Sequence, residues 1–254
     1  MCIISLHFQD HAQYKLIIAA NRDEFYERPT KEAGFWDDAP ELLAGRDLER
    51  MGTWLGITKQ GRFAALTNYR DPTNEHPNKN SRGQIVTSFL TGGTSTTDFL
   101  KELRKRKDDY NGFNIIVGTV DELYYYGNRQ TDIVKLNGGT YTVSNHLLNT
   151  PWPKVEKART MLQKYVTTHE EIDVDALFEQ LAYREIAPDE SLPNTGIGMD
   201  LERKLSPIFI KTDGYGTRSS TVLLINQDNE VTFIERTYNE GSFKKENKFT
   251  FRIK

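Results

Sequence analysis

Three residues near the amino terminus carry side chains that together could perform nucleophilic chemistry: Cys2, Arg22 and Asp23. Cys2 is the sole cysteine among the 254 residues. A guanidinium near a thiol lowers the thiol pKa from about 8.5, and a carboxylate can hold and orient an α-ammonium. If Met1 is removed, Cys2 carries both a thiol and a free α-amine, whose pKa of about 7.7–8.0 suits a base near neutral pH. We therefore expect Cys2 to be an N-terminal nucleophile.

Two apolar segments must bring these residues together. In 2–8, Cys2, Ile4, Leu6 and Phe8 would share one face of an extended chain, and the residues between them would share the other, which predicts a strand. The polar stretch 9–13 predicts a hairpin loop. The segment 14–25 then predicts a second strand that ends in Arg22 and Asp23. In a hairpin the end of the second strand lies beside the start of the first, next to Cys2. The same charged residues are also compatible with a solvated turn that contains an ion pair.

Further polar residues stand at the ends of later predicted strands. Asn68 in "AALTNYRD" and Asn145 in "YTVSNHLL" could donate hydrogen bonds to an oxyanion, although asparagines at such positions are also common in turns and caps. Arg218 opens the apolar run in "GYGTRSSTVLLI". It could support the electrostatics of a site or serve as a charge at the edge of a sheet.

The remaining pattern alternates blocks of strands with helices. The expected strands are 54–58, 63–68, 113–119, 122–128, 132–138, 140–145 and two long C-terminal stretches, 206–238 and 242–253. The expected helices are 82–90, 95–110, 153–167 and 174–182. Ser95 and Asp98 form a capping pair at the start of the second helix. We expect one α+β domain over 1–254, in which helices cover mostly antiparallel sheets, with a surface loop at 187–198.

Composition excludes several classes of protein. The formal net charge of −3 argues against a general nucleic-acid binder. A single cysteine excludes an internal disulfide and provides too few thiolates for a structural zinc site. No apolar run approaches the ~20 residues of a membrane span, and the amino terminus lacks a signal-peptide pattern. We expect a cytoplasmic protein without an integral membrane segment, and the oligomeric state stays open.

Several motifs together resemble the NRDE family, the relatives of transport and Golgi organisation protein. They are "MCII", "NRDEF", "GTWLGI", "TNYRD", "SN" and "YGTRSSTVLL", and they run from residue 2 to about residue 235. The combination is specific, whereas no single motif is. One departure is Met51 before "GTW", where relatives often have glycine.

The resemblance implies a fold and a set of site residues. The family is thought to share the four-layer αββα sandwich of the N-terminal-nucleophile hydrolases. In the cysteine acylases of that fold, penicillin V acylase and bile salt hydrolase, the site residues fall at positions that correspond to Cys2, Arg22, Asp23, Asn68, Asn145 and Arg218. The implied activity is hydrolysis of a small amide or acyl compound without a required cofactor.

Two other functions remain open at the level of sequence. Family members are associated with haem mobilisation and lipid metabolism, so the same cleft could bind haem or lipid without catalysis. Candidate haem ligands are Cys2, His7, His11 and His146, and the absence of a CxxCH sequence excludes covalent c-type attachment. A plain interaction module is the third possibility, and it leaves the grouping of Cys2 with Arg22 and Asp23 unexplained.

Overall fold

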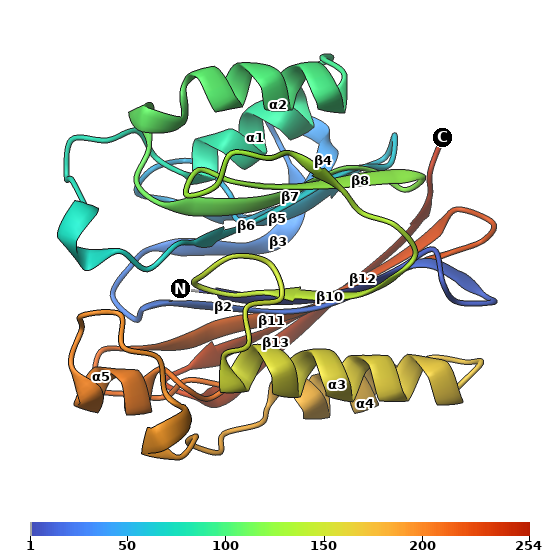
Figure 1. The fold of residues 1–254 in the computed structure, drawn as a ribbon. Helices are drawn as coiled ribbons and strands as arrows, with labels where there is room; N and C mark the ends of the chain where they lie inside the picture. The colour runs from blue at the N-terminus through green and yellow to red at the C-terminus, as the bar shows by residue number, and fades with distance from the viewer. Residues whose placement is uncertain (1) are drawn as a thin grey trace.

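The computed structural model describes residues 2–254 and shows four layers in the order helix, sheet, sheet, helix (Figure 1). Both sheets are antiparallel throughout their named strand pairs. This is the αββα sandwich that the family resemblance implies.

One sheet has six strands and contains the amino-terminal hairpin. In spatial order its strands are β10 (Gly139–Val143), β1 (Cys2–Phe8), β2 (Tyr14–Phe25), β11 (Tyr215–Asn226), β12 (Glu230–Asn239) and β13 (Ser242–Arg252). β1 and β2 pair along their whole shared length, so the predicted hairpin is confirmed.

The second sheet has seven strands that follow one another in chain order. They are β3 (Thr30–Trp36), β4 (Ala39–Asp47), β5 (Leu55–Thr58), β6 (Arg62–Asn68), β7 (Phe113–Thr119), β8 (Glu122–Gly127) and β9 (Val134–Lys135). This meander keeps neighbouring strands adjacent in space, as short connections favour.

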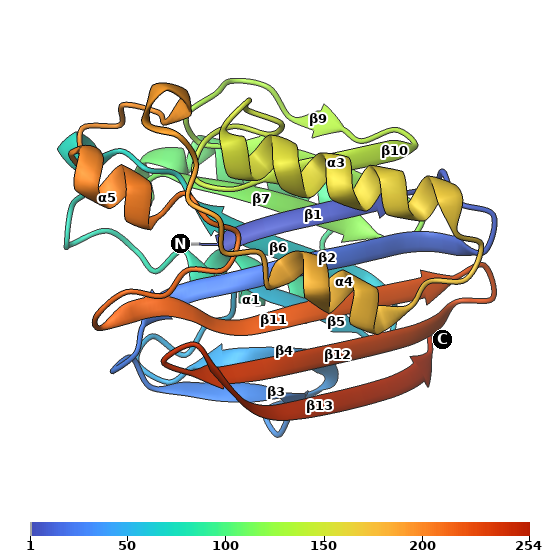
Figure 2. The same ribbon diagram turned by 90° about the horizontal axis from the view of Figure 1, so that it is seen from below.

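Helices cover the outer face of each sheet (Figure 1). α1 (Gly83–Thr91) and α2 (Thr96–Lys105) pack on the seven-stranded sheet, while α3 (Pro153–Thr168) and α4 (Val174–Leu181) pack on the six-stranded one. Figure 2 shows α3 and α4 across the six-stranded sheet. The short elements are α5 (Met199–Lys204), η1 (Pro72–Asn74), η2 (Lys107–Asp109) and η3 (Asp189–Ser191). No helix within residues 2–254 is long and apolar enough to cross a bilayer.

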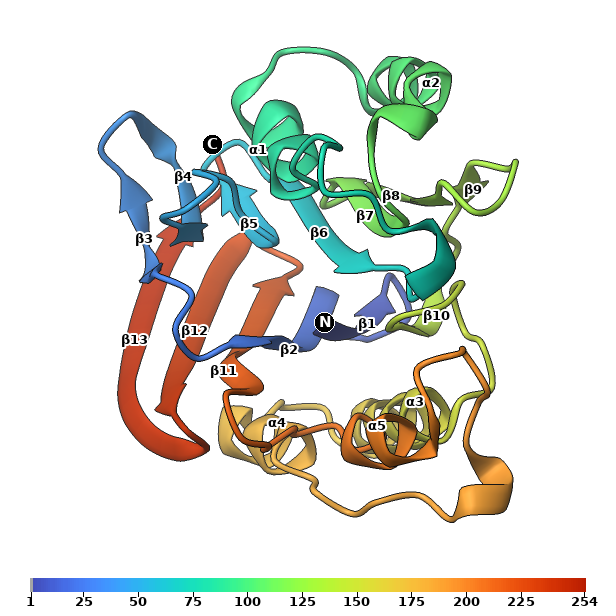
Figure 3. The same cartoon turned by 90° about the vertical axis from the view of Figure 1, so that its left-hand side faces the viewer.

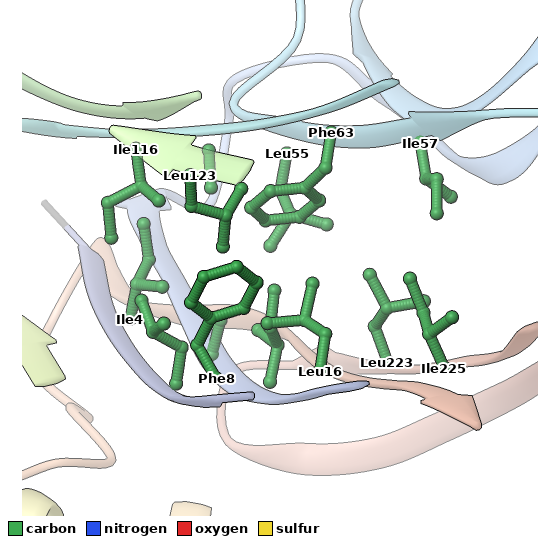
Figure 4. Close-up of a cluster of buried hydrophobic side chains, with 14 of the residues drawn as sticks. Ile4, Phe8, Leu16, Leu55, Ile57, Phe63, Ile116, Leu123, Leu223 and Ile225 are labelled. Atoms are coloured by element: carbon green, nitrogen blue, oxygen red, sulfur yellow. The ribbon is translucent and has the colours of Figure 1, made fainter. Parts of the chain in front are cut away.

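The main core lies between the two sheets (Figure 4). Ile4, Leu6 and Phe8 of β1 point into this core, whereas Ile3 faces the helices on the other side. Both faces of β1 are therefore buried, and this explains why its sequence is an almost continuous apolar run. The alternation predicted for 2–8 is confirmed.

The predicted start of α2 is also confirmed. Ser95 is the N-cap, and its Oγ accepts a hydrogen bond from the backbone N–H of Asp98 at 3.1 Å. The same hydroxyl donates to the Asp98 carboxylate at 2.8 Å. The cap satisfies one of the donors that the first turn of a helix leaves without a partner.

Three parts of the chain differ from the sequence-based expectation. β3 and β4 were not predicted, because their pairing contains two register shifts that break the period-two pattern. The segment 206–210 was expected to be a strand but is an irregular buried segment, in which Phe209 N–H donates to the carbonyl of Tyr183. The helix α5, which directly follows the expected loop 187–198, was not predicted.

Candidate active site

Figure 3 shows the end of the sandwich where β1 begins and β2 and β6 end. A cleft of about 240 Å³ opens there between the sheets. Four of the six predicted site residues line it: Cys2, Arg22, Asp23 and Asn68. The opposite wall comes from two segments after β4 and β6, within 47–54 and 76–83. Sequence-distant segments therefore meet at the end of the amino-terminal hairpin.

The hairpin register places Cys2 directly opposite Arg22. Both side chains are buried and lie on the face of β1 and β2 that points between the sheets, like Ile4 and Ala20. The Arg22 guanidinium stacks over the ring of Trp54 at 4.6 Å, and its Nη2 lies 3.8 Å from a carboxylate oxygen of Glu24. Its Nη1 is buried and has no hydrogen-bond partner among the described residues.

Burial controls the thiol of Cys2. Removal from water raises the pKa of Cys2, and the nearby Arg22 guanidinium lowers that pKa by a smaller amount. The sequence-based expectation of a lowered pKa was therefore wrong in its net direction, because it considered the charge without the desolvation. A thiol that stays protonated at rest needs a base when it attacks a carbonyl carbon.

Asp23 follows Arg22 near the end of β2, where it contributes to the lining of the cleft, although its side chain lies on the other face of the sheet from that of Arg22. It is buried, and Thr217 Oγ1 donates to its Oδ1 at 2.8 Å. Burial raises the pKa of Asp23, while the nearby ammonium of Lys154 lowers it. The carboxyl group is therefore fixed by β11 and faces a cation from α3.

The two asparagines lie one behind the other. Asn68 lines the cleft, whereas Asn145 is fully buried and its Nδ2 donates to the backbone carbonyl of Asn68 at 3.1 Å. The Oδ1 of Asn145 accepts hydrogen bonds from Ser144 Oγ at 3.1 Å and Lys154 Nζ at 3.3 Å. Asn145 therefore supports the wall of the cleft from behind rather than forming its surface.

Arg218 lies outside this cleft. The pairing of β2 with β11 shifts register between Thr217 and Ser219, so Arg218 is the extra residue of a bulge. Its Nη1 donates to the carbonyl oxygens of Phe25 at 2.7 Å and Arg28 at 3.1 Å. Arg218 lines a smaller neighbouring pocket, which shares the side chains of Arg22 and Trp54 with the cleft.

Comparison with known proteins identifies the family. The family model described as "Transport and Golgi organisation 2" matches residues 1–240. The chain belongs to this family. The "Transport and Golgi organization 2 homolog" of Mus musculus is 38% identical over 257 residues, with 93% of each chain covered. The "Transport and Golgi organization protein 2" of Drosophila melanogaster is 29% identical, with 93% of this chain and 92% of the relative covered.

A solved structure supports the fold of this Transport and Golgi organisation 2 family member. The C2A mutant of the conjugated bile acid hydrolase from Clostridium perfringens superimposes with a TM-score of 0.56, covering 97% of this chain and 92% of the hydrolase. The sequences are 9% identical, so the likeness concerns the fold alone. The fold is that of the N-terminal-nucleophile hydrolases.

Sequence reasoning missed two contributors to the site of this family member. Trp54 stacks on Arg22, and a Cβ atom added to Gly45 would lie 2.3 Å from Cη2 of that ring. Trp54 lies in the "GTWLGI" motif, but nothing in the sequence pairs it with Arg22. Lys154 approaches the site from the first turn of α3, which no local pattern indicates.

The four candidate haem ligands lie in different surroundings. His7 is five residues along β1 from Cys2, about 17 Å at the rise of an extended strand. The Nδ1 of His7 is bonded to Thr140 Oγ1 at 2.7 Å, and the ring of His11 lies 6.4 Å from the ring of His7. His146 packs between the rings of Tyr69 and Trp152. Of the four ligands, Cys2 is the one that lines the cleft.

Proposed function

We propose that the protein is an N-terminal-nucleophile cysteine hydrolase that acts on a small amide or acyl compound. The observation that carries this proposal is the direct pairing of Cys2 with Arg22 at the wall of a cleft, beside the buried carboxyl of Asp23. A third polar residue, Asn68, lines the same cleft. An interaction module or a general lipid carrier has no need for this grouping.

The chemistry follows from the proposed roles. After removal of Met1, the α-amine of Cys2 accepts the thiol proton as the sulfur attacks the carbonyl carbon of the substrate. The carbonyl oxygen becomes an oxyanion, which a side-chain N–H of Asn68 stabilises. The resulting α-ammonium returns the proton to the leaving nitrogen, and the carbon–nitrogen bond breaks. Water then attacks the thioester carbon, with the α-amine again as base. The carbon–sulfur bond breaks, the α-ammonium returns the proton to the sulfur of Cys2, and the acid is released.

The surrounding residues have supporting roles in this proposal. Asp23, held by Thr217, orients the α-amine. Arg22, fixed by its stacking on Trp54, stabilises the thiolate as it forms. The raised pKa of the buried thiol supports the need for an adjacent base, since an unassisted thiol would carry little thiolate at neutral pH.

The test compares three proteins: the processed form that begins at Cys2, a form that retains Met1, and Cys2→Ala. The substrates are a panel of N-acyl amino acids and acyl thioesters. We expect the processed form to hydrolyse a member of the panel, and the other two to lose most of that rate, about 10²–10⁴-fold. Circular dichroism should show that Cys2→Ala remains folded, because one small thiol contributes little packing.

Two outcomes would overturn the proposal. If the form that retains Met1 is as fast as the processed form, the α-amine is not the base. If no form hydrolyses any member of the panel, the cleft is a binding site. A haemin titration would then test the carrier alternative, with a sharp Soret band that is lost in Cys2→Ala as its expected sign.

A further inference from the structure

Lys154 is a buried lysine next to the cleft that the proposed reaction does not use. It lies in the first turn of α3 with 5% of its side chain exposed, whereas Lys157 and Lys164 of the same helix are exposed. Taking an ammonium out of water is costly unless partners compensate. The buried ammonium of Lys154 must therefore interact with groups that compensate for its loss of water.

The Nζ of Lys154 donates hydrogen bonds to two acceptors. It donates to Oδ1 of Asn145 at 3.3 Å and to the carbonyl of Leu205, the residue after α5, at 3.1 Å. Three charged groups lie near enough to influence it: Asp23 on β2, Glu202 on α5 and Arg70 after β6. The ionisable thiol of Cys2 on β1 is near it as well. Arg70 and Glu202 also pair with each other at 2.6 Å.

The bond to Leu205 by itself fits a purely structural role, in which Lys154 joins α3 to the end of α5. The bond to Asn145 also fixes the orientation of the Asn145 side-chain amide. An ammonium can only donate hydrogen bonds, so the oxygen of the Asn145 amide must face Lys154. The amide nitrogen then faces the carbonyl of Asn68, to which it donates. A continuous path thus connects the ammonium to a residue that lines the cleft.

We propose that Lys154 is a positioning residue of the Cys2 site: its ammonium fixes the Asn145 amide behind Asn68 and supplies the positive charge that faces Asp23. This deepens the proposed function and depends on it for any effect on turnover. The electrostatic part can be tested without turnover, because Cys2 is near enough to Lys154 for the two charges to interact.

The first test measures the rate of iodoacetamide alkylation of Cys2 against pH in wild type, Lys154→Met and Lys164→Met. Loss of a nearby positive charge disfavours the thiolate, so Lys154→Met should alkylate roughly threefold or more slowly at pH 7, where Lys154 is still mostly protonated. Lys164→Met removes an exposed lysine from the same helix and should match wild type. A folded Lys154→Met protein with the wild-type profile overturns the proposal.

Lys154→Arg distinguishes the effect of losing the charge from the effect of altered packing in Lys154→Met. It restores the positive charge, so its alkylation profile should return toward wild type. If Lys154→Arg is as slow as Lys154→Met, the charge is not the cause and the proposal is wrong.

A second measurement needs no change at Lys154, in case those variants do not fold. In protein labelled with ¹³C at lysine Cε, one lysine should titrate well below the others, since burial lowers the pKa of Lys154 to about 8. The isosteric change Asp23→Asn removes the facing carboxylate and should lower that midpoint further. A midpoint that does not move overturns the coupling of Lys154 to the site.

Turnover distinguishes this proposal from the function on which it rests. Where the processed wild type hydrolyses a substrate, Lys154→Met should lower kcat and Lys164→Met should leave it unchanged. Where no form hydrolyses any substrate, the proposed function fails, and the alkylation and titration results still decide whether Lys154 positions the site.

Discussion

The same strands run from an apolar end of the space between the sheets to a polar one. At the apolar end, Phe8 of β1, Leu16 of β2 and Phe63 of β6 interdigitate (Figure 4). At the other end, the same three strands carry Cys2, Arg22 and Asn68, which line the cleft. β11 also runs from an apolar end to a polar one, from Ile225 in this core to Thr217, which bonds Asp23 on the other face of the sheet.

The difference lies in what each end requires of its side chains. At the apolar end the requirement is volume and hydrophobicity, which each strand meets with its own alternation. At the polar end each buried group needs a partner in the right direction, and the partners come from other parts of the chain. Arg22 depends on Trp54, and Asn145 depends on Lys154. The four predictions that follow test this contrast.

The largest effect is expected at the apolar end. Phe63→Ala removes a fully buried ring and should lower the free energy of unfolding by about 3–5 kcal/mol, measured by urea denaturation. Because Phe63 lies at the opposite end of β6 from Asn68, the pH profile of Cys2 alkylation in the folded variant should not change. Phe243→Ala, at a side chain that is 61% exposed, should be nearly neutral. A shifted thiol profile in Phe63→Ala would show that the two ends are coupled.

Glu235 is a buried carboxyl group on the inner face of β12, and its effect on stability should depend on pH. Its Oε1 accepts a hydrogen bond from the backbone N–H of Ala33 at 2.6 Å, and burial raises the pKa of Glu235 from 4.5 to about 7. Between those values the folded state binds more protons than the unfolded state. Stability should therefore fall as pH rises from about 4.5 to about 7, by on the order of 3 kcal/mol from this group.

Glu235→Gln keeps an acceptor for Ala33 and removes the titration. Denaturant melts at pH 5 and pH 7 should show a smaller loss of stability in Glu235→Gln than in wild type. Glu230→Gln, at an exposed position of the same strand, should keep the wild-type slope. An unchanged slope in Glu235→Gln would mean that another group causes the dependence.

Gly45→Ala tests the support of Arg22 from the opposite sheet. The added Cβ would lie 2.3 Å from Cη2 of Trp54, so the ring must move away from its place over Arg22. Overpacking of this kind costs about 1–3 kcal/mol, measurable as a lower thermal midpoint together with altered tryptophan fluorescence. Gly93→Ala, where nothing lies within 4 Å of the new Cβ, serves as the control and should leave both signals unchanged.

The smallest effect concerns the turn that leads into the cleft wall. Met51 adopts φ +59°, a left-handed conformation that glycine tolerates best, and its side chain is exposed. Met51→Gly should raise the free energy of unfolding by up to about 1 kcal/mol, because it relieves that strain without loss of packing. Met199→Gly, in the helix α5, should not stabilise the protein. Equal melting of Met51→Gly and wild type would mean that the turn is not strained.

The positions of the missed strands show where sequence reasoning reaches its limit. The hairpin of β1 and β2 was predictable because both strands are long and regular in their apolar pattern. β3 and β4 were missed because bulges disrupt that pattern and β3 is an edge strand. The segment 206–210 was wrongly predicted as a strand because it is apolar. It is buried, but the N–H of Ile210 donates to Thr217 Oγ1 rather than to a strand partner.

The sequence by itself determined the local features of this protein: the hairpin, the face on which Cys2 lies, the cap of α2 and the family. These follow from alternation, spacing and motif order, which are properties of adjacent residues. Only the tertiary structure decided the net direction of the thiol pKa, since desolvation depends on what covers the strand. It also decided the place of Arg218, through a bulge, and the approach of Lys154 from α3. The burial of a side chain and the direction in which it points depend on segments far apart in the chain, so no local pattern predicts them.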